Sequence, residues 1–352
     1  SFRMQSSWLP FDWELGFDED EQNENAFYSS SQKITSTTSS SHSPFSSPPA
    51  KRSKNVASTR RDSLVAKSMG ELRFFPRQRD ALAFLAEQRK LFSDMRVFSV
   101  EDTKIINGAR KYLVSSVSRF WLWYAKRPPE NRHFFELITE EERCRLFFDL
   151  EYQKAANPDV EEKNCMTHFF ETLGAVLKEE LAIDIDCSKN SIVLDSSTAS
   201  KFSQHVILHL PDGLLFPSAS ELRPLIERLS NRLLESPTGR LKVLDSDKKT
   251  TICDLSVYSR NHNFRLFLSS KAKKAIPFVL AESCKFYGGR VPKQEEIFID
   301  SLCVPPGWQK ADVISLASLH PSSQSLLSSG LSRCQLARTL RWWRAISLAI
   351  PG

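Results

Sequence analysis

Glycine is scarce in this sequence, at 11 of 352 residues. Neither G-x-G-x-x-G nor G-x-x-x-x-G-K-[S/T] occurs, although such loops are the usual way in which a strand–helix turn holds phosphates. Their absence removes the commonest routes to a dinucleotide-dependent dehydrogenase or a P-loop ATPase. The chain also has no uninterrupted apolar run of membrane length, so the sequence predicts no transmembrane helix.

Cysteine is also sparse, with seven residues at irregular spacing. This odd number favours a reduced intracellular protein over a disulfide framework. Structural zinc sites need closely spaced pairs of ligands. The late candidates are Cys284, Cys303, His320 and Cys334, which are separated by 18, 16 and 13 intervening residues. We therefore expect no zinc site in this chain.

Charge is unevenly distributed along the chain. Residues 1–27 contain Arg3 and seven acidic residues, which gives this segment a net charge of −6. The rest, with 47 Lys and Arg and 35 Asp and Glu, carries +12. A basic body of this kind favours a polyanionic partner, because such binding releases counterions.

The first 70 residues do not have the pattern of a folded domain. Thirteen of the 22 residues from Ser29 to Ala50 are Ser or Thr and three are Pro, which is too polar to offset the chain entropy of folding. We expect a disordered tail over 1–70, acidic and then Ser/Thr-rich. The basic residues of 51–61 are either a nuclear-import patch or solvated charge.

The remaining sequence predicts an α+β fold. Helical periodicity predicts helices over 77–91, 160–181 and 218–234, the last with Ser220 as its cap. Residues 110–117 mix β-branched and aromatic residues. The pattern predicts strands at 133–138, 145–152, 192–194 and 202–210. Segments 250–259 and 264–269 are expected to pair as strands. The order β-α-β-β-α-β over 145–269 is typical of a split βαβ, or RRM-like, unit.

Three polar patterns within these strands carry chemistry. In the first, strand alternation places Asp149 and Glu151 on one face, with Cα atoms about 7 Å apart. Two carboxylates at this separation suit a pair of divalent metal ions about 3.5–4 Å apart. The alternative is a strand whose polar face meets solvent.

The second pattern places Ser203 and His205 on one strand face, directly after Lys201. A hydroxyl, an imidazole and an ammonium group together suit a phosphate site. A Ser–His nucleophile pair is the competing interpretation, but the G-x-S-x-G turn is absent. A structural role for His205 is the third alternative.

The third pattern begins at Asp254, within an otherwise apolar strand. A buried acid is costly unless it is paired or binds metal. A basic, asparagine-rich turn and then Arg265 and Lys271 follow, which suits triphosphate binding beside a metal.

In this order, the three patterns resemble the three motifs of the archaeo-eukaryotic primase superfamily, and their detail is most similar to the eukaryotic primase-polymerases. The resemblance extends from about Glu71 to about Ile314. The strings that carry it are Phe-Phe-Asp149-Leu-Glu151, Asp195-Ser-Ser-Thr, Lys201-Phe-Ser-x-His205 and Val257-Tyr-Ser-Arg-Asn-x-Asn-Phe-Arg265-Leu.

The resemblance implies a primase core with an RRM-like palm, and nucleotide addition to a DNA 3′ end with Mn²⁺ or Mg²⁺. Asp149, Glu151 and Asp254 would be catalytic and would bind the metal ions. The incoming nucleotide would be held by six residues: Arg110, Lys201, Ser203, His205, Arg265 and Lys271. Arg77 and Gln78 match positions where the family contacts the template.

The expected organisation has four parts: the tail over 1–70, an N-terminal helical and β module over 71–142, the palm over 143–318 and a truncated C-terminal tail over 319–352. The implied partners are single-stranded DNA template, primer, nucleoside triphosphates and replication proteins, with no membrane and a monomeric chain. The implied location is the nucleus, with the mitochondrion as a second compartment, and the implied role is replication stress or damage tolerance.

Two positions depart from the family pattern. His262 stands where relatives carry arginine, and Phe135 aligns with a tyrosine that lies near the incoming sugar. The zinc module that supports primer initiation in relatives is not apparent, so we expect extension of primers without primer-free synthesis.

Two other function classes stay open: a non-catalytic DNA- or partner-binding isoform, and a metal-dependent nuclease or phosphohydrolase that uses the same acids.

Overall fold

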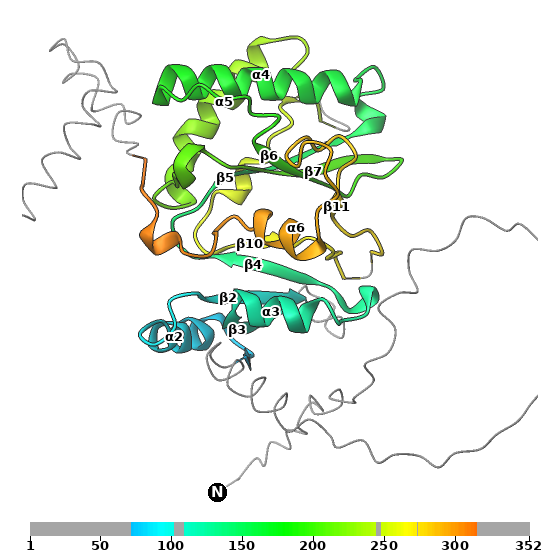
Figure 1. Ribbon diagram of the computed structural model, residues 1–352. Coiled ribbons are helices and arrows are strands. Elements are labelled where there is room, and N and C mark those ends of the chain that lie inside the picture. Colours follow the sequence, from blue (N-terminus) through cyan, green and yellow to red (C-terminus); the bar gives the residue numbers. More distant parts are fainter. Residues whose placement is uncertain (1–71, 102–108, 244–247, 273, 315–352) are drawn as a thin grey trace, which may run out of the picture. The chain divides into compact units, whose positions relative to one another are not determined.

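The structure is a computed structural model that describes residues 72–101, 109–243, 248–272 and 274–314 (Figure 1). All of them belong to one of the two units of the chain, Asn55–Gly352. The predicted tails over 1–70 and 319–352 lie outside the described residues. Helices alternate along the chain with strands that form antiparallel sheets, which confirms the α+β class. Within the described ranges, none of the helices has the length and apolar character that crossing a membrane requires.

The first sheet has five antiparallel strands. Their order across the sheet is β1 (Arg73–Phe75), β3 (Arg110–Ser116), β2 (Met95–Glu101), β4 (Phe134–Ile138) and β10 (His262–Arg265). Helix α2 (Gln78–Arg89) packs on β2 and β3, and helix α3 (Val117–Tyr124) follows β3 directly. Because β10 comes from far downstream, the two predicted modules share this sheet.

The second sheet has four antiparallel strands, in the order β11 (Val279–Leu280), β6 (Ser191–Asp195), β7 (Lys201–Leu208) and β5 (Leu146–Gln153). Residues 252–254 run antiparallel along the other side of β5, where Cys253 pairs with Leu150. The N–H of Glu151 donates to the carbonyl of Ile252 at 2.8 Å, and the N–H of Asp254 donates to that of Asp149 at 2.9 Å.

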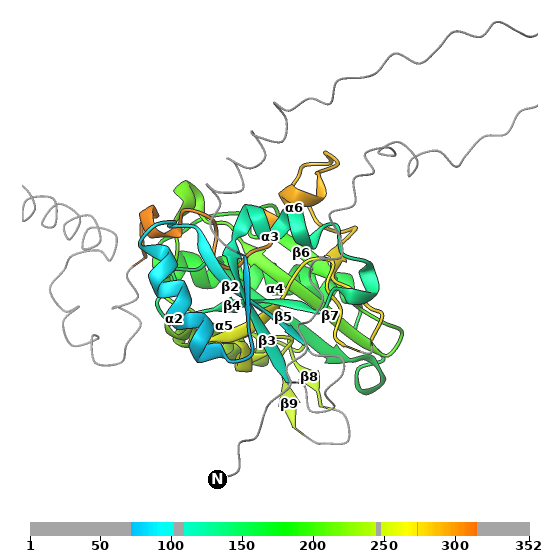
Figure 2. The ribbon, with the colours of Figure 1, turned by 90° about the horizontal axis from the view of Figure 1, so that it is seen from below.

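Two helices, α4 (Glu162–Leu181) and α5 (Arg223–Glu235), lie together on one face of the second sheet, and β4 and β10 lie on its other side (Figure 1). Helix α4 buries an apolar stripe, as the periodicity predicts. It ends where Ala182 adopts a left-handed conformation. A short helix, α6 (Gln294–Asp300), and a separate ribbon of β8 (Leu241–Lys242) and β9 (Lys249–Thr250) complete the described elements (Figure 2).

Two local predictions are wrong. Ser220 does not cap α5: it lies in a preceding 3-10 helix, Ser220–Leu222, and α5 begins at Arg223 with Pro224 in its first turn. Segments 250–259 and 264–269 do not pair with each other, since β10 pairs with β4. The carboxylate of Asp254 accepts a hydrogen bond from the N–H of Ser256 at 2.8 Å, which turns the chain into a 3-10 helix, Leu255–Val257.

Both faces of β5 are buried, and its alternation decides where the acids point. Phe148 packs against Phe169 of α4, with ring centroids 5.1 Å apart. Phe147, one residue earlier, packs in the opposite direction against Phe264 of β10, also at 5.1 Å. Asp149 shares the face of Phe147, between the two sheets. A one-residue slip would move this acid into the apolar layer under α4, so burial fixes the register.

Candidate functional site

Three carboxylates lie together on neighbouring strands. Asp149 and Glu151 share one face of β5, and Asp254 ends the 252–254 segment beside it. Both oxygens of Asp254 accept hydrogen bonds from Ser256, from its N–H at 2.8 Å and from its hydroxyl at 2.9 Å. Main-chain hydrogen bonds between residues more than 100 positions apart along the sequence therefore assemble the predicted acidic cluster.

The pKa of Asp149 is strongly raised. Burial raises its pKa to about 7, and the nearby negative charges of Glu151 and Asp254 act in the same direction. Among the described residues its buried Oδ1 has no hydrogen-bond partner. A half-buried carboxylate beside two others holds its proton more tightly than a free one, and a cation that approaches it favours the charged form; such perturbed acids are typical of functional sites.

Basic side chains surround these acids. The ammonium group of Lys201 is paired with the carboxylate of Glu151. Burial lowers the pKa of Arg265, while the charge of Asp149 opposes this shift. Burial also lowers the pKa of Lys271, helped by the positive charges of Arg265 and Lys201. These three predicted nucleotide-binding cations are therefore close enough to one another and to the acids to interact.

Ser203 and His205 lie directly opposite the acids in the sheet register, Ser203 beside Glu151 and His205 beside Asp149. The imidazole of His205 is sandwiched between the rings of Phe264 and Phe278, at centroid distances of 3.9 and 3.7 Å.

Burial, and then the charges of Arg265, His262 and Lys271, hold the pKa of His205 well below its usual range. His205 is therefore neutral and offers one N–H donor, with its Nε2 3.9 Å from Asp149 Oδ1.

Arg110 reaches the same region from the first sheet. Its guanidinium lies 4.7 Å from the ring centroid of Phe135 and 3.3 Å from Glu101 Oε1. Its charge also lowers the pKa of His262, although burial is the larger cause and Asp254 opposes both. Arg110 and Asp254 thus both lie near His262.

Arg77 and Gln78 do not join this cluster. Gln78 begins α2 and Arg77 precedes it, on the helix that packs against β2 and β3. In the part of the chain that the structure describes, no contact connects either side chain with the carboxylates.

The chemistry of the site suits a divalent cation, since carboxylate oxygens are the ligands that Mg²⁺ prefers. The unpartnered Oδ1 of Asp149 is the atom that most needs one. Across the described ranges, however, no three acidic, imidazole or thiol groups converge closely enough to hold an ion. Glu151 is engaged by Lys201 and Asp254 by Ser256, so these side chains must exchange partners before all three acids bind one ion.

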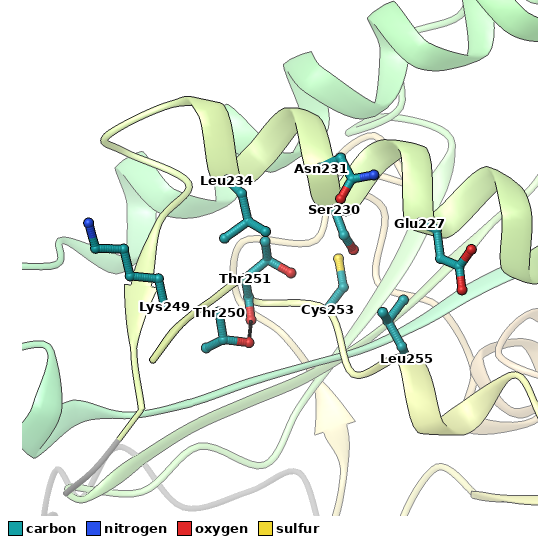
Figure 3. Close-up of a pocket in the computed structure, with 9 residues that line it drawn as sticks. All are labelled: Glu227, Ser230, Asn231, Leu234, Lys249, Thr250, Thr251, Cys253 and Leu255. Carbon is teal, nitrogen blue, oxygen red and sulfur yellow. Dashed lines mark hydrogen bonds between the residues drawn. The ribbon is translucent and has the colours of Figure 1, made fainter. Parts of the chain in front are cut away.

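A pocket of about 290 Å³ lies beyond the 252–254 segment, against α5 (Figure 3). None of the predicted site residues lines it, although Cys253 and Leu255 flank Asp254. The lining comes from α5, β9 and the turn after it: Glu227, Ser230, Asn231, Leu234, Lys249, Thr250, Thr251, Cys253 and Leu255. The acid and cation cluster between the sheets, and not this pocket, is therefore the candidate functional site.

The sequence analysis gave no site role to three side chains of the cluster: Glu101, Phe264 and Phe278. Glu101 is opposite Arg110 in the β2–β3 register. The alternation of residues 95–101, followed by a loop and the strand at 110–116, is the signal that could have paired them. The two aromatic rings reach His205 only through tertiary contacts.

Comparison with known proteins finds relatives named DNA-directed primase/polymerase protein. The protein from Danio rerio is 31% identical over 263 residues, which cover 65% of this chain and 49% of the relative. The Gallus gallus protein is 29% identical over 299 residues (65% and 51%), and the Homo sapiens protein is 29% identical over 316 residues (71% and 55%). The chain thus spans about half the length of the curated relatives it matches. No family model matches it. The resemblance to the eukaryotic primase-polymerases is confirmed.

Proposed function

We propose that this chain, a sequence relative of the DNA-directed primase/polymerase proteins, adds nucleotides to a primer on a DNA template. The observation that carries the proposal is the meeting of three carboxylates with basic side chains from both sheets, around the half-buried Asp149. Nucleotidyl transfer needs both carboxylates and basic side chains, since the carboxylates hold metal ions at the reacting phosphate and the basic side chains hold the triphosphate. Replication stress and damage tolerance are the proposed setting.

The proposed palm is the second sheet with α4 and α5. Its chain order is β5, α4, β6, β7, α5 and the 252–254 segment, and its spatial order is β6, β7, β5 and 252–254. This arrangement supports an RRM-like unit whose fourth strand is reduced to a few residues. In such a unit the two central strands, here β5 and β7, supply the site from the face that α4 and α5 leave open.

We assign the binding of Mn²⁺ or Mg²⁺ to Asp149, Glu151 and Asp254. When bound, such ions stabilise the charge that develops on the transferring phosphate. The raised pKa of Asp149 supports this assignment, because a nearby cation would favour its charged form.

The remaining residues have binding roles. Lys201, Arg265 and Lys271 would neutralise the triphosphate, with Arg110 contributing from the first sheet. His205, held neutral and fixed between two rings, would donate one hydrogen bond, and Ser203 would donate another. Arg77 and Gln78 would contact the template at a distance from the chemistry.

Primer extension tests the proposal. The purified chain is incubated with a labelled primer on a longer template, all four deoxynucleoside triphosphates, and Mn²⁺ or Mg²⁺. We expect longer products, and none from a Glu151→Gln Asp149→Asn double variant of unchanged fold. Glu87→Gln, which alters an exposed acid paired with Lys90, is the matched control. Shortened primers would instead indicate a nuclease, and DNA binding without any product would indicate a non-catalytic binding protein.

A further inference from the structure

Glu101 lies where two of the proposed triphosphate-binding cations are held. It is the last residue of β2, and its Cα pairs with that of Arg110 across the hairpin. Its Oε1 accepts a hydrogen bond from Arg110 Nη2 at 3.3 Å, and its Oε2 accepts one from the main-chain N–H of Ala272 at 2.7 Å. One carboxylate therefore connects Arg110 with the residue that directly follows Lys271.

The chain before Lys271 is anchored separately. The N–H of Ser270 donates to the carbonyl of Arg132 at 2.9 Å. The hydroxyl of Ser269 accepts a hydrogen bond from the N–H of Phe134 at 3.1 Å. These bonds fix the main chain on one side of Lys271, and the Glu101–Ala272 bond fixes it on the other. Among the described contacts, Glu101 provides the side-chain anchor that follows the lysine.

Charge supports the same role. Burial lowers the pKa of the half-buried Arg265, and the negative charge of Glu101, after that of Asp149, opposes this shift and so favours the charged form of the arginine. The side chain of Glu101 is only 14% exposed, so water screens these interactions weakly. The carboxylate thus offsets a part of the repulsion among cations that must stay together before a triphosphate arrives.

We propose that Glu101 is a positioning residue that orients Arg110 and the main chain at Lys271 for triphosphate binding. The inference rests on the proposed function. Glu101 touches no reacting atom, so its contribution is to hold the two cations in the geometry that the nucleotide needs. Its loss should weaken nucleotide binding while leaving the chemical step almost unchanged.

The test compares Glu101→Ala with Glu101→Gln in primer extension at varied nucleotide concentration. Loss of a charge-assisted contact should raise the nucleotide KM of Glu101→Ala about tenfold, with kcat changed less than about threefold. Glu101→Gln keeps an oxygen acceptor for the Ala272 N–H, so it should restore a part of the affinity. Binding of a fluorescent nucleoside triphosphate should weaken in parallel. Glu87→Ala is the control that should change neither value.

An unchanged KM in Glu101→Ala overturns the proposal, as does a lower KM, which would show that Glu101 competes with the triphosphate. A loss of kcat that parallels a loss of thermal stability overturns it too, because the role would then be structural. If Glu101→Ala does not fold, Glu101→Gln decides by the same criterion. A wild-type chain that neither binds nucleotide nor extends primers refutes the proposed function and this inference together, whereas normal extension by both variants refutes only the role of Glu101.

Discussion

Lys201 and Glu151 form a diagonal ion pair across the neighbouring strands β7 and β5. In the sheet register, the Cα of Lys201 faces that of Gln153, and the Cα of Glu151 faces that of Ser203. The pair is about one-third exposed at both ends, so its net stabilisation is small. Such a pair is easily exchanged. On the proposed function, a nucleotide that arrives with its metal ion would offer phosphate to the lysine and a cation to the glutamate.

Glu151→Gln and Asp149→Asn, made singly, should each abolish nucleotide addition while duplex binding stays within about twofold of wild type. Each change removes a charge that would stabilise cations at the transferring phosphate and leaves the shape of the side chain unchanged. Labelled-primer extension and a filter-binding assay on the same preparations measure the two properties. Extension by either variant at close to the wild-type rate would contradict the metal assignment.

Lys201→Ala and Arg265→Ala should mainly raise the nucleotide KM, because a phosphate contact exists in both the ground state and the transition state. A charge-assisted contact contributes about 1.5–3 kcal/mol, which corresponds to a tenfold to hundredfold loss in kcat/KM. Steady-state extension measures this loss, with the exposed Lys249→Ala as control. If nucleotide affinity stayed normal and DNA affinity fell, both residues would belong to the template groove instead.

The raised pKa of Asp149 predicts how stability depends on pH without metal. The folded chain keeps a proton on this carboxyl up to about pH 7, whereas the unfolded chain releases it near the ordinary value of 3.8. The folded state thus binds more protons between these values, and Asp149 makes stability fall as pH rises through this window. Asp149→Asn should therefore have the wild-type Tm near pH 4 and a Tm several degrees higher at pH 8. Thermal unfolding in EDTA provides the measurement, and Tm curves that stay parallel would contradict it.

Replacing Glu136, which lies outside the candidate site, should strongly lower the stability of the fold. Only 1% of it is exposed, and it accepts hydrogen bonds from Arg96 Nη2 at 2.6 Å and from the N–H groups of Cys303 and Val304 at 2.8 and 3.0 Å. Glu136→Ala leaves these donors without that acceptor and should lower the free energy of unfolding by about 3–5 kcal/mol. Urea unfolding tests this, against Glu87→Ala, whose exposed pair should contribute less than about 1 kcal/mol. A loss below that control range would show that the buried network repairs itself.

The sequence alone determined the parts of the molecule that local patterns encode. The apolar periodicity of α4 predicted its length, since one face of a long helix must be buried. Period-two alternation predicted that Asp149 and Glu151 share a strand face, because this follows from strand geometry in any sheet. The motif strings predicted the resemblance to the primase-polymerases that the relatives confirm. None of these three inferences needed knowledge of which residues pack against the segment in the folded protein.

Tertiary structure decided everything that depends on a neighbour far along the chain. The Ser256 contact bends the chain after Asp254, so the expected strand over 250–259 does not form. β10 joins a sheet made by strands more than a hundred residues earlier, and this brings Phe264 to His205. Glu101 acquires its role only when Ala272 reaches it. The pKa of Asp149 depends on burial and on charges from separate strands, because desolvation and Coulomb energy are set by three-dimensional distance and not by separation along the sequence.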